Sequence, residues 1–373
     1  MTLSPILISS RDVADLAALL AQYPVIAVDL EADSMHNYQE KVCLLQFSTP
    51  ETTILVDPLA GAELAPLQPI LADPAIRKIF HAADYDIRCL ARDFAFEVRG
   101  LFDTMISCQF LGEERFGLAD VLRKYFAVEL DKQFQRADWS KRPLSEGMIR
   151  YAAEDTGHLH RLALVLEQKL AEKGRLEWVR EEFSLLEKVR FNAQQGPEFL
   201  RFKGAATLNR RQLAVLELLL QWRDAEAQRR DCPLFRVLAN QPILELARLM
   251  PRERQQLQEI AGLPPRLVDR YGGKLLDAIG RGLDLPAEDL PVYPRGERRE
   301  RDPQVERRFN RLKDWRKKAA ADLELDPGVL INNGVLDELA RRNPASEQDL
   351  EQMSLLKNWQ RRELGEAILR VLD

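Results

Sequence analysis

The second half of the chain repeats itself, and this repeat limits the possible folds more than any other feature of the sequence. Trp222-Arg223 recurs as Trp315-Arg316, 93 residues further along, and three more segments match at the same distance without a gap. The matching segments are Leu246-Ala247-Arg248 with Leu339-Ala340-Arg341, Pro251 with Pro344, and Leu257 with Leu350. Apolar residues in this half follow helical spacing only. We therefore expect two copies of a small all-helical domain, at residues 205–285 and 300–373, joined by a Pro- and Arg-rich linker.

Residues 1–200 instead carry both strand and helix patterns. Strands are expected at residues 25–31, 42–49, 53–56, 78–80 and 98–102. The short loops between the first three favour an antiparallel meander. Helices are expected at residues 11–22, 64–71, 84–94, 117–125, 145–167 and 176–191, and a further one begins near residue 103. Ser10 is a plausible N-cap of the first helix. This part should fold as an α/β domain, with a mixed sheet covered by helices.

The first strand ends in two acids, Asp29 and Glu31, separated by one residue. Because side chains alternate between the two faces of a strand, both carboxylates point to the same side, about 7 Å apart along the chain. Two carboxylates at the end of a core strand repel each other and resist desolvation. A bound cation removes both costs. The alternative is a solvated strand end with two surface acids.

Two further acidic patterns lie near predicted helices. In Phe80-His81-Ala82-Ala83-Asp84-Tyr85-Asp86, the acids follow a short strand and begin a helix. Asp84 is expected to be an N-cap. Asp86 would otherwise only stabilise the first turn through the helix dipole, by about 0.3–1 kcal/mol. Tyr151 and Asp155 are four residues apart, so they share one face of a helix, which by itself would be an ordinary amphipathic helix.

Composition narrows the chemistry further. The four cysteines (Cys43, Cys89, Cys108 and Cys232) are far apart, so neither a zinc knuckle nor a disulfide framework is indicated. There are only four histidines, and His158 and His160 lie two apart on a helix, where they do not share a face. A zinc site is therefore poorly supported. No stretch approaches the roughly 18 apolar residues of a membrane span, and we expect a soluble, cytosolic protein.

These motifs together resemble the DEDD exonucleases, in the subclass that carries a tyrosine, and within them ribonuclease D. The matching segments, besides the acids, are Leu44-Leu45-Gln46-Phe47-Ser48-Thr49, Leu101-Phe102-Asp103-Thr104, Gly117-Leu118-Ala119-Asp120, Gln135-Arg136-Ala137-Asp138-Trp139 and Arg142-Pro143-Leu144. The repeated tail resembles the helical HRDC domain that this family shares with RecQ-type helicases. The resemblance covers nearly the whole chain and implies a ribonuclease H-like fold for residues 1–200.

The resemblance also implies a site. It makes Asp29, Glu31, Asp86 and Asp155 ligands of two divalent metal ions, and it places Tyr151 beside the attacking water. Four hard oxygen ligands suit Mg²⁺ or Mn²⁺, and two such ions about 3.5–4 Å apart serve phosphodiester hydrolysis. The implied reaction is 3′–5′ exonucleolytic hydrolysis of RNA to 5′-mononucleotides, with precursor tRNA as a substrate. One departure is Ala32, where bacterial ribonuclease D usually has Phe; in this motif the chain is closer to the nuclear exonuclease of the exosome.

RNA must bind although the net charge is −5 and the pI is about 5.7. Residues 295–318 contain eleven basic and five acidic residues, and residues 201–236 contain eight and four. Either stretch could hold phosphates or could equally be a solvated, salt-bridged helix. Trp222 and Trp315 are expected to be core residues rather than base-stacking platforms. Two other functions remain open from sequence: an exonuclease acting on DNA, and a scaffold that binds nucleic acid without cleaving it.

Overall fold

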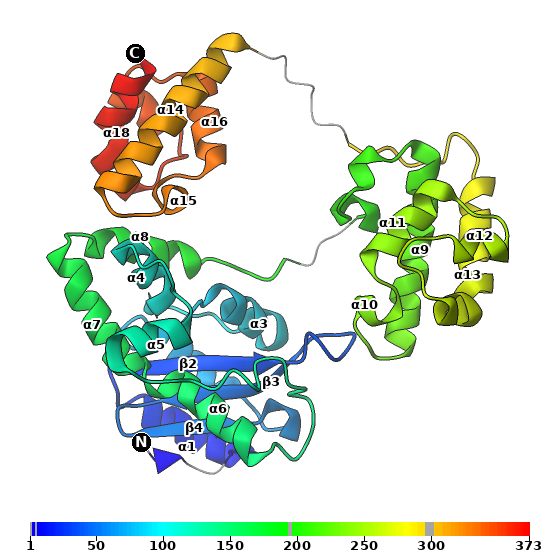
Figure 1. Ribbon diagram of the computed structural model, residues 1–373. Helices are drawn as coiled ribbons and strands as arrows, with labels where there is room; N and C mark the ends of the chain where they lie inside the picture. Colours follow the sequence, from blue (N-terminus) through cyan, green and yellow to red (C-terminus); the bar gives the residue numbers. More distant parts are fainter. Residues whose placement is uncertain (1, 4–5, 193–195, 295–301) are drawn as a thin grey trace. The chain divides into compact units, whose positions relative to one another are not determined.

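The computed structural model describes residues 2–3, 6–192, 196–294 and 302–373 (Figure 1). The chain forms two compact units. The first contains Met1–Ala32, Val42–Phe191 and Glu300–Asp373, and the second contains Asp33–Lys41 and Asn192–Arg299. No helix among the described residues is long and apolar enough to cross a membrane. The first unit therefore joins the predicted α/β domain to the second helical repeat, and the second unit holds the first repeat.

A six-stranded mixed sheet forms the centre of the α/β domain, in the order β1-β4-β3-β2-β5-β6. Its strands are β1 (Thr2–Leu3), β2 (Val25–Ala32), β3 (Val42–Ser48), β4 (Thr52–Val56), β5 (Arg77–Phe80) and β6 (Leu101–Asp103). Strands β2, β3 and β4 pair antiparallel, which confirms the predicted meander, whereas β5 and β6 add in parallel. Strand β2 therefore lies inside the sheet, and its apolar side chains are buried as the continuous apolar run predicts.

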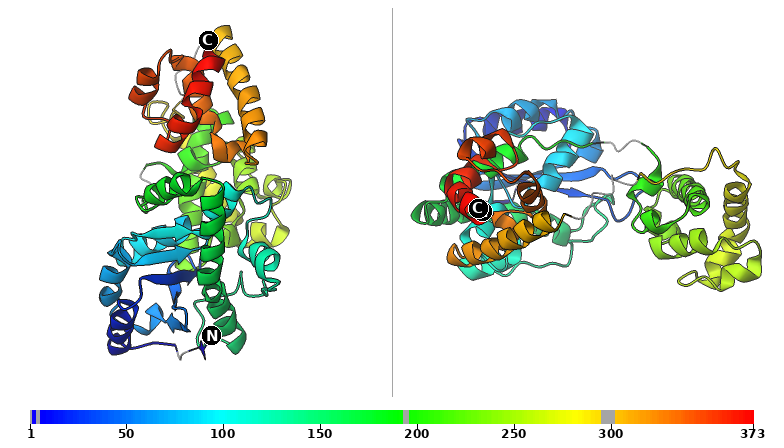
Figure 2. Two further views of the ribbon diagram at one scale, coloured as in Figure 1. Left: turned by 90° about the vertical axis from the view of Figure 1, so that its left-hand side faces the viewer. Right: turned by 90° about the horizontal axis from the view of Figure 1, so that it is seen from above.

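Among the described residues, eight α-helices of this domain precede the repeats. Their arrangement around the sheet can be followed in Figures 1 and 2. The helices are α1 (Ser10–Leu20), α2 (Gln68–Ala72), α3 (Asp84–Phe94), α4 (Thr104–Leu111), α5 (Leu118–Phe126), α6 (Glu146–Gly157), α7 (Leu159–Glu172) and α8 (Leu176–Leu186). Helix α6 packs across β2, β3 and β4, and α7 packs against β2 and β5. Both cover the sheet face that carries Asp29, because Ser48 bonds to Thr156 of α6 and Arg77 pairs with Glu167 of α7.

Two predictions about α1 and α6 were wrong. The single helix expected at residues 145–167 is two helices, α6 and α7, which meet at His158. Gly157 ends α6, and a glycine within a helix costs about 1 kcal/mol relative to alanine, so the break falls at the weakest position. The N-cap of α1 is Ser9, which accepts the amide of Asp12, rather than Ser10.

Each helix of the second repeat begins 93 residues after the corresponding helix of the first repeat. The first contains α9 (Arg210–Arg229), α10 (Leu234–Val237), α11 (Asn240–Leu249), α12 (Arg254–Gln258) and α13 (Pro265–Asp284). The second contains α14 (Pro303–Asp322), α15 (Pro327–Leu330), α16 (Asn333–Arg342), α17 (Glu347–Gln352) and α18 (Asn358–Leu372). The tail is therefore a structural duplication, as its sequence predicted.

The Trp-Arg pair that reveals the repeat has a structural role in each copy. Arg223 and Arg316 are buried, and each donates to the carbonyl at the end of the following short helix, Leu238 at 3.1 Å and Ile331 at 2.6 Å. Each preceding tryptophan is partly buried against its own core, as expected. A buried guanidinium that satisfies a helix-end carbonyl explains why arginine follows tryptophan in both copies.

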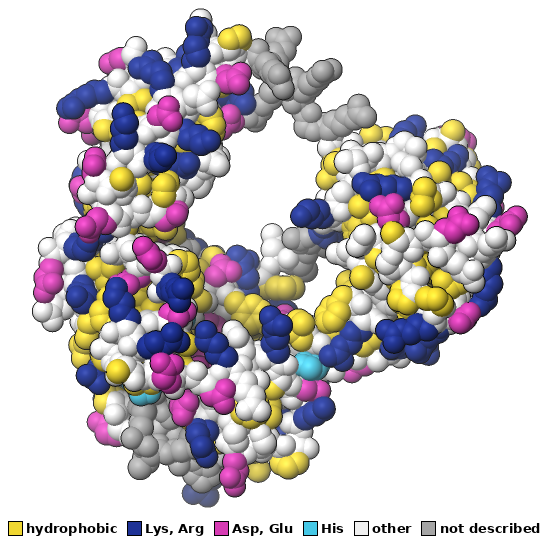
Figure 3. Space-filling model, viewed as in Figure 1, with side chains coloured by type: hydrophobic (Ala, Val, Ile, Leu, Met, Phe, Trp, Pro, Cys, Tyr) yellow, Lys and Arg dark blue, Asp and Glu magenta, His cyan; other side chains and the backbone are white. Residues whose placement is uncertain are grey.

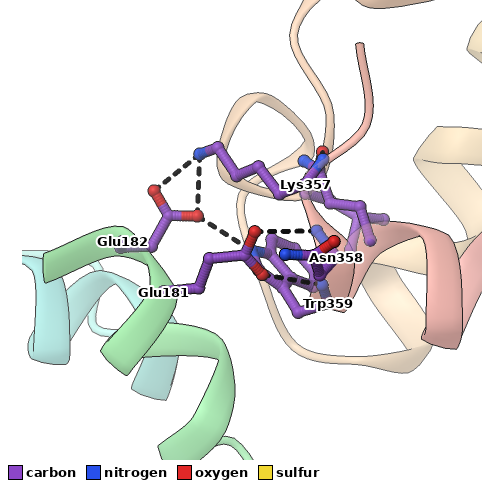
Figure 4. A network of polar contacts seen from close by, with 7 residues as sticks. Glu181, Glu182, Lys357, Asn358 and Trp359 are labelled. Atoms are coloured by element: carbon purple, nitrogen blue, oxygen red, sulfur yellow. Dashed lines mark hydrogen bonds and ion pairs between the residues drawn. The ribbon is translucent and has the colours of Figure 1, made fainter. Parts of the chain in front are cut away.

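The second repeat packs on the α/β domain through the beginning of α18 (Figure 4). Glu181 accepts the backbone amides of Asn358 and Trp359 at 2.8 and 2.9 Å. Glu182 accepts the Trp359 indole N–H at 2.8 Å and the Lys357 ammonium. The Trp359 ring also stacks on Trp178, with ring centroids 4.9 Å apart. The carboxylates thus satisfy helix-terminal N–H groups that would otherwise lack partners, and the stacked rings exclude water from the contact.

Candidate active site

Asp29 and Glu31 lie on one face of β2, as the alternation of strand side chains predicted. The antiparallel ladder sets Asp29 opposite Gln46 and Glu31 opposite Leu44 of β3. The apolar residues between and before the acids are buried, whereas both acids are partly exposed. The strand therefore delivers two carboxylates from a rigid, packed element to the edge of solvent, which is the geometry that a preorganised site requires.

Asp86 reaches the same region from the first turn of α3, where it is only 5 % exposed. The preceding loop is unusual because Ala82 has a φ of 70°. Asp103, at the N-cap of α4, accepts the amides of Ala82 and Ala83 at 3.2 and 2.8 Å, and so holds this loop in place. The expectation that Asp84 caps α3 was wrong: Ala83 occupies the N-cap, and Asp84 forms an exposed ion pair with Arg88.

Tyr151 and Asp155 project from α6, one helical turn apart, and the Tyr151 hydroxyl bonds to the Asp155 carboxylate. The tyrosine ring is held by Phe134 and Trp139, whose ring centroids lie 6.2 and 6.0 Å from it. Gly147 makes room for this arrangement, because a Cβ there would come within 2.8 Å of the Phe134 ring. The loop before α6 therefore fixes the orientation of the phenol.

The electrostatics show that the acids share one environment. Burial raises the pKa of Asp29 to about 7 and that of Asp155 to about 8. Burial raises the pKa of Glu31 to about 10, with further contributions from the charges of Asp29, Asp155 and Asp86. Burial and the charge of Asp29 also raise the pKa of Asp86. These carboxylates thus lie close enough to oppose one another's ionisation, as a site built for cations requires.

Burial and the neighbouring carboxylates raise the pKa of Tyr151 as well, well above its usual value. The phenol therefore stays protonated at neutral pH. A neutral hydroxyl donates one hydrogen bond and accepts others, so Tyr151 can orient a water molecule but does not act as its base.

The acidic side chains of the site suit the divalent cations that the sequence implies. Within the described part of the chain, no three His, Cys, Asp or Glu side chains enclose a point tightly enough to hold a metal ion by themselves. Mg²⁺ does not need such a cage, because it retains several waters and binds through one or two carboxylates together with substrate phosphate oxygens. Four mutually repelling carboxylates, of which Asp29, Glu31 and Asp155 are partly exposed, fit that mode of binding.

Sequence reasoning missed the residues that support Tyr151. It treated the segment before α6 as a polar loop, yet Trp139 is almost fully buried there. Arg142 fastens this segment to the sheet, with its guanidinium donating to both carboxylate oxygens of Asp57 at 2.5 and 2.7 Å and to the carbonyl of Cys43. The sequence feature that could have predicted this supporting role is a pair of aromatic residues, Phe134 and Trp139, within an otherwise polar stretch.

Comparisons with known proteins agree with this geometry. A family model described as 3′–5′ exonuclease matches residues 6–171, and one described as HRDC domain matches residues 212–279 and 305–372. The fold, the acidic site and these matches define a 3′–5′ exonuclease that carries two HRDC domains.

Relatives of this class share most of the chain. Ribonuclease D of Granulibacter bethesdensis is 33% identical over 78% of this chain and 75% of the relative. Ribonuclease D of Gluconacetobacter diazotrophicus is 30% identical over 99% of this chain and 93% of the relative. The crystal structure of Escherichia coli RNase D matches with a TM-score of 0.75 and 26% identity, over 100% of this chain and 99% of that one. The chain belongs to the ribonuclease D family and is a hydrolytic 3′–5′ exoribonuclease.

Proposed function

We propose that this enzyme removes nucleotides one at a time from the 3′ ends of stable-RNA precursors, with precursor tRNA as a substrate. The observation that carries the proposal is the convergence of Asp29, Glu31, Asp86 and Asp155, whose pKa values all rise. The E. coli relative is described as an exoribonuclease involved in structured RNA processing, which supports the choice of substrate. A cytoplasmic location is part of the same proposal, and cell fractionation tests it.

In this proposal the four acids hold two divalent ions, Mg²⁺ or Mn²⁺. When bound, such ions activate the attacking water, stabilise the leaving 3′ oxygen and screen the phosphate. Tyr151 accepts a hydrogen bond from the attacking water and orients it toward phosphorus. The water oxygen bonds to phosphorus as the bond to the leaving 3′ oxygen breaks. The water gives up one proton to solvent and the 3′ oxygen takes one up, so the products are a 5′-mononucleotide and an RNA with a free 3′-hydroxyl. Phe134 and Trp139 keep the phenol in position during this exchange.

RNA binding is assigned to the second repeat rather than the first. In α14, five cationic side chains are exposed: Arg307, Arg311, Lys313, Lys317 and Lys318. Residues 295–301, the beginning of the predicted basic stretch, lie outside the described residues. In the first repeat, Arg211 donates to three backbone carbonyls, Arg223 is buried, and Arg229 pairs with Glu226. Figure 3 shows acidic residues mixed with the basic ones on the visible face of both repeats, so we expect moderate, salt-sensitive affinity.

A product assay tests the proposal. A 3′-extended precursor tRNA, labelled uniformly in its phosphates, is incubated with Mg²⁺, with Mn²⁺ and with chelator. We expect stepwise shortening and 5′-mononucleotides with either metal, and none with chelator. Matched RNA and DNA oligonucleotides distinguish the two exonuclease activities. Asp29→Ala should abolish hydrolysis while RNA binding persists, whereas an unchanged rate in this variant would remove the proposed site.

The boundaries proposed for the domains are residues 1–200, 205–285 and 300–373. Expression of the three pieces, followed by circular dichroism and thermal unfolding of each, tests whether they fold separately. Because Trp359 stacks on Trp178, we expect residues 300–373 to be less stable alone than in the full chain.

A further inference from the structure

Gln46 on β3 is fully buried, and neither its amide oxygen nor its amide nitrogen has a hydrogen-bond partner among the described residues. Leaving a buried polar atom unsatisfied costs about 1–3 kcal/mol. The neighbours Leu45 and Phe47 are apolar, and an apolar residue at position 46 would avoid this cost. Packing alone therefore does not explain a glutamine here.

The sheet places this side chain next to the catalytic acids. Gln46 is the direct cross-strand partner of Asp29 in the antiparallel ladder of β2 and β3. Side chains of directly opposed residues lie on the same face, with Cβ atoms about 4.5–5.5 Å apart. A glutamine arm extends about one bond further than that of aspartate, so the Gln46 amide and the Asp29 carboxylate are within reach of each other.

Helix α6 closes the space above Gln46. On the same face of β3, Leu44 belongs to a buried cluster with Ala152, and Ser48 donates to the Thr156 hydroxyl at 2.7 Å. Gln46 lies between these two positions, so it is covered by the stretch of α6 from Ala152 to Thr156, which includes Asp155.

We propose that Gln46 is a positioning residue for the metal site: when cation binding ionises Asp29, the Gln46 amide, which has no partner among the described residues of the metal-free protein, supplies an Nε2–H donor to that carboxylate and holds it in its metal-binding orientation. This inference rests on the proposed function, in which Asp29 is a metal ligand. A carboxylate has about four acceptor positions, so it can accept an amide N–H while binding cations through its other lone pairs. A neutral donor also adds no charge that would compete with the cations. Partners of this kind typically change metal affinity by 10–100-fold.

The test compares Gln46→Met with the natural protein by isothermal titration calorimetry with Mn²⁺ alone, in the full chain without RNA. We expect the Kd for Mn²⁺ to rise about 10–100-fold. The melting temperature of the metal-free variant should not fall, because methionine fills the space and removes two unsatisfied polar atoms. At saturating RNA, raising the Mn²⁺ concentration should restore most of the lost rate.

Gln360→Met is the matched control. Gln360 is also buried, but its Nε2 donates to the Leu330 carbonyl at 2.7 Å, far from the acids in sequence and within the second repeat. This variant should lower the melting temperature and leave the Mn²⁺ affinity unchanged. Gln46→Leu serves as a second apolar variant if Gln46→Met does not fold.

Unchanged Mn²⁺ affinity in a folded Gln46 variant overturns the inference and makes Gln46 a packing residue only. Asp29→Asn separates this failure from failure of the proposed function. If Asp29→Asn loses Mn²⁺ binding while Gln46→Met keeps it, only the role of Gln46 is wrong. If Asp29→Asn binds Mn²⁺ normally, the proposed metal site itself is wrong.

Discussion

Glu31 should destabilise the metal-free protein at neutral pH, and replacing it with glutamine should raise the melting temperature. Burial and three neighbouring acids raise its pKa from 4.5 to about 10. A carboxyl group with a raised pKa binds its proton more tightly in the folded state. Its contribution to stability is therefore complete below about pH 4.5 and is lost as the pH rises toward 10.

The size of the effect follows from the pKa difference. Each pH unit above the unfolded pKa costs about 1.4 kcal/mol, so the ceiling at pH 7.5 is about 4 kcal/mol. Glu31 is partly exposed, and water relieves part of this cost. We expect Glu31→Gln to raise the free energy of unfolding of the metal-free protein by about 2 kcal/mol, which for a domain of this size corresponds to roughly 4–8 °C.

The assay is differential scanning calorimetry in EDTA at pH 5.5 and 7.5, repeated with Mg²⁺. In EDTA, Glu31→Gln should raise the melting temperature strongly at pH 7.5 and only slightly at pH 5.5. Mg²⁺ should raise the melting temperature of the natural protein more than that of the variant. Glu63 is exposed, so Glu63→Gln is the control and should leave the melting temperature unchanged at both pH values. A variant that melts at or below the natural protein in EDTA at pH 7.5 would refute the reasoning.

Three further predictions concern separate parts of the chain. Tyr151→Phe should lower kcat by about 100-fold while the Kd for Mn²⁺ stays within twofold; an unchanged kcat would disprove the orienting role. Trp359→Ala removes the stack on Trp178 and should lower the free energy of unfolding by about 3–5 kcal/mol. Limited proteolysis should then cleave residues 302–373 earlier than in the natural protein. Arg229 and Lys274 lower the pKa of Glu226 to about 2, so its stabilisation is present above pH 4.5 and lost as the pH falls toward 2. Between pH 4.5 and pH 2, Glu226→Gln should therefore lose about 1–2 kcal/mol less free energy of unfolding than the natural protein. An equal loss in both proteins would contradict the assignment.

Features that depend on local periodicity could be predicted from the chain alone. The alternation of strand side chains put Asp29 and Glu31 on one face, and the helical turn put Tyr151 and Asp155 on another. The spacing of 93 residues defined both helical repeats, start for start. These features need no long-range information, because the geometry of one strand or one helix sets them.

The support that distant segments give to the site depends on long-range packing, which the sequence did not reveal. Tertiary contacts place Phe134 and Trp139 against Tyr151 and join the second repeat to α8. They also set Gln46 opposite Asp29, where its amide has no hydrogen-bond partner among the described residues. Each of these contacts depends on which faces of the sheet and helices meet, and a polar or apolar pattern along one segment does not specify its partner. The acids could be read from the chain, whereas the residues that hold them in place became visible only after folding brought them together.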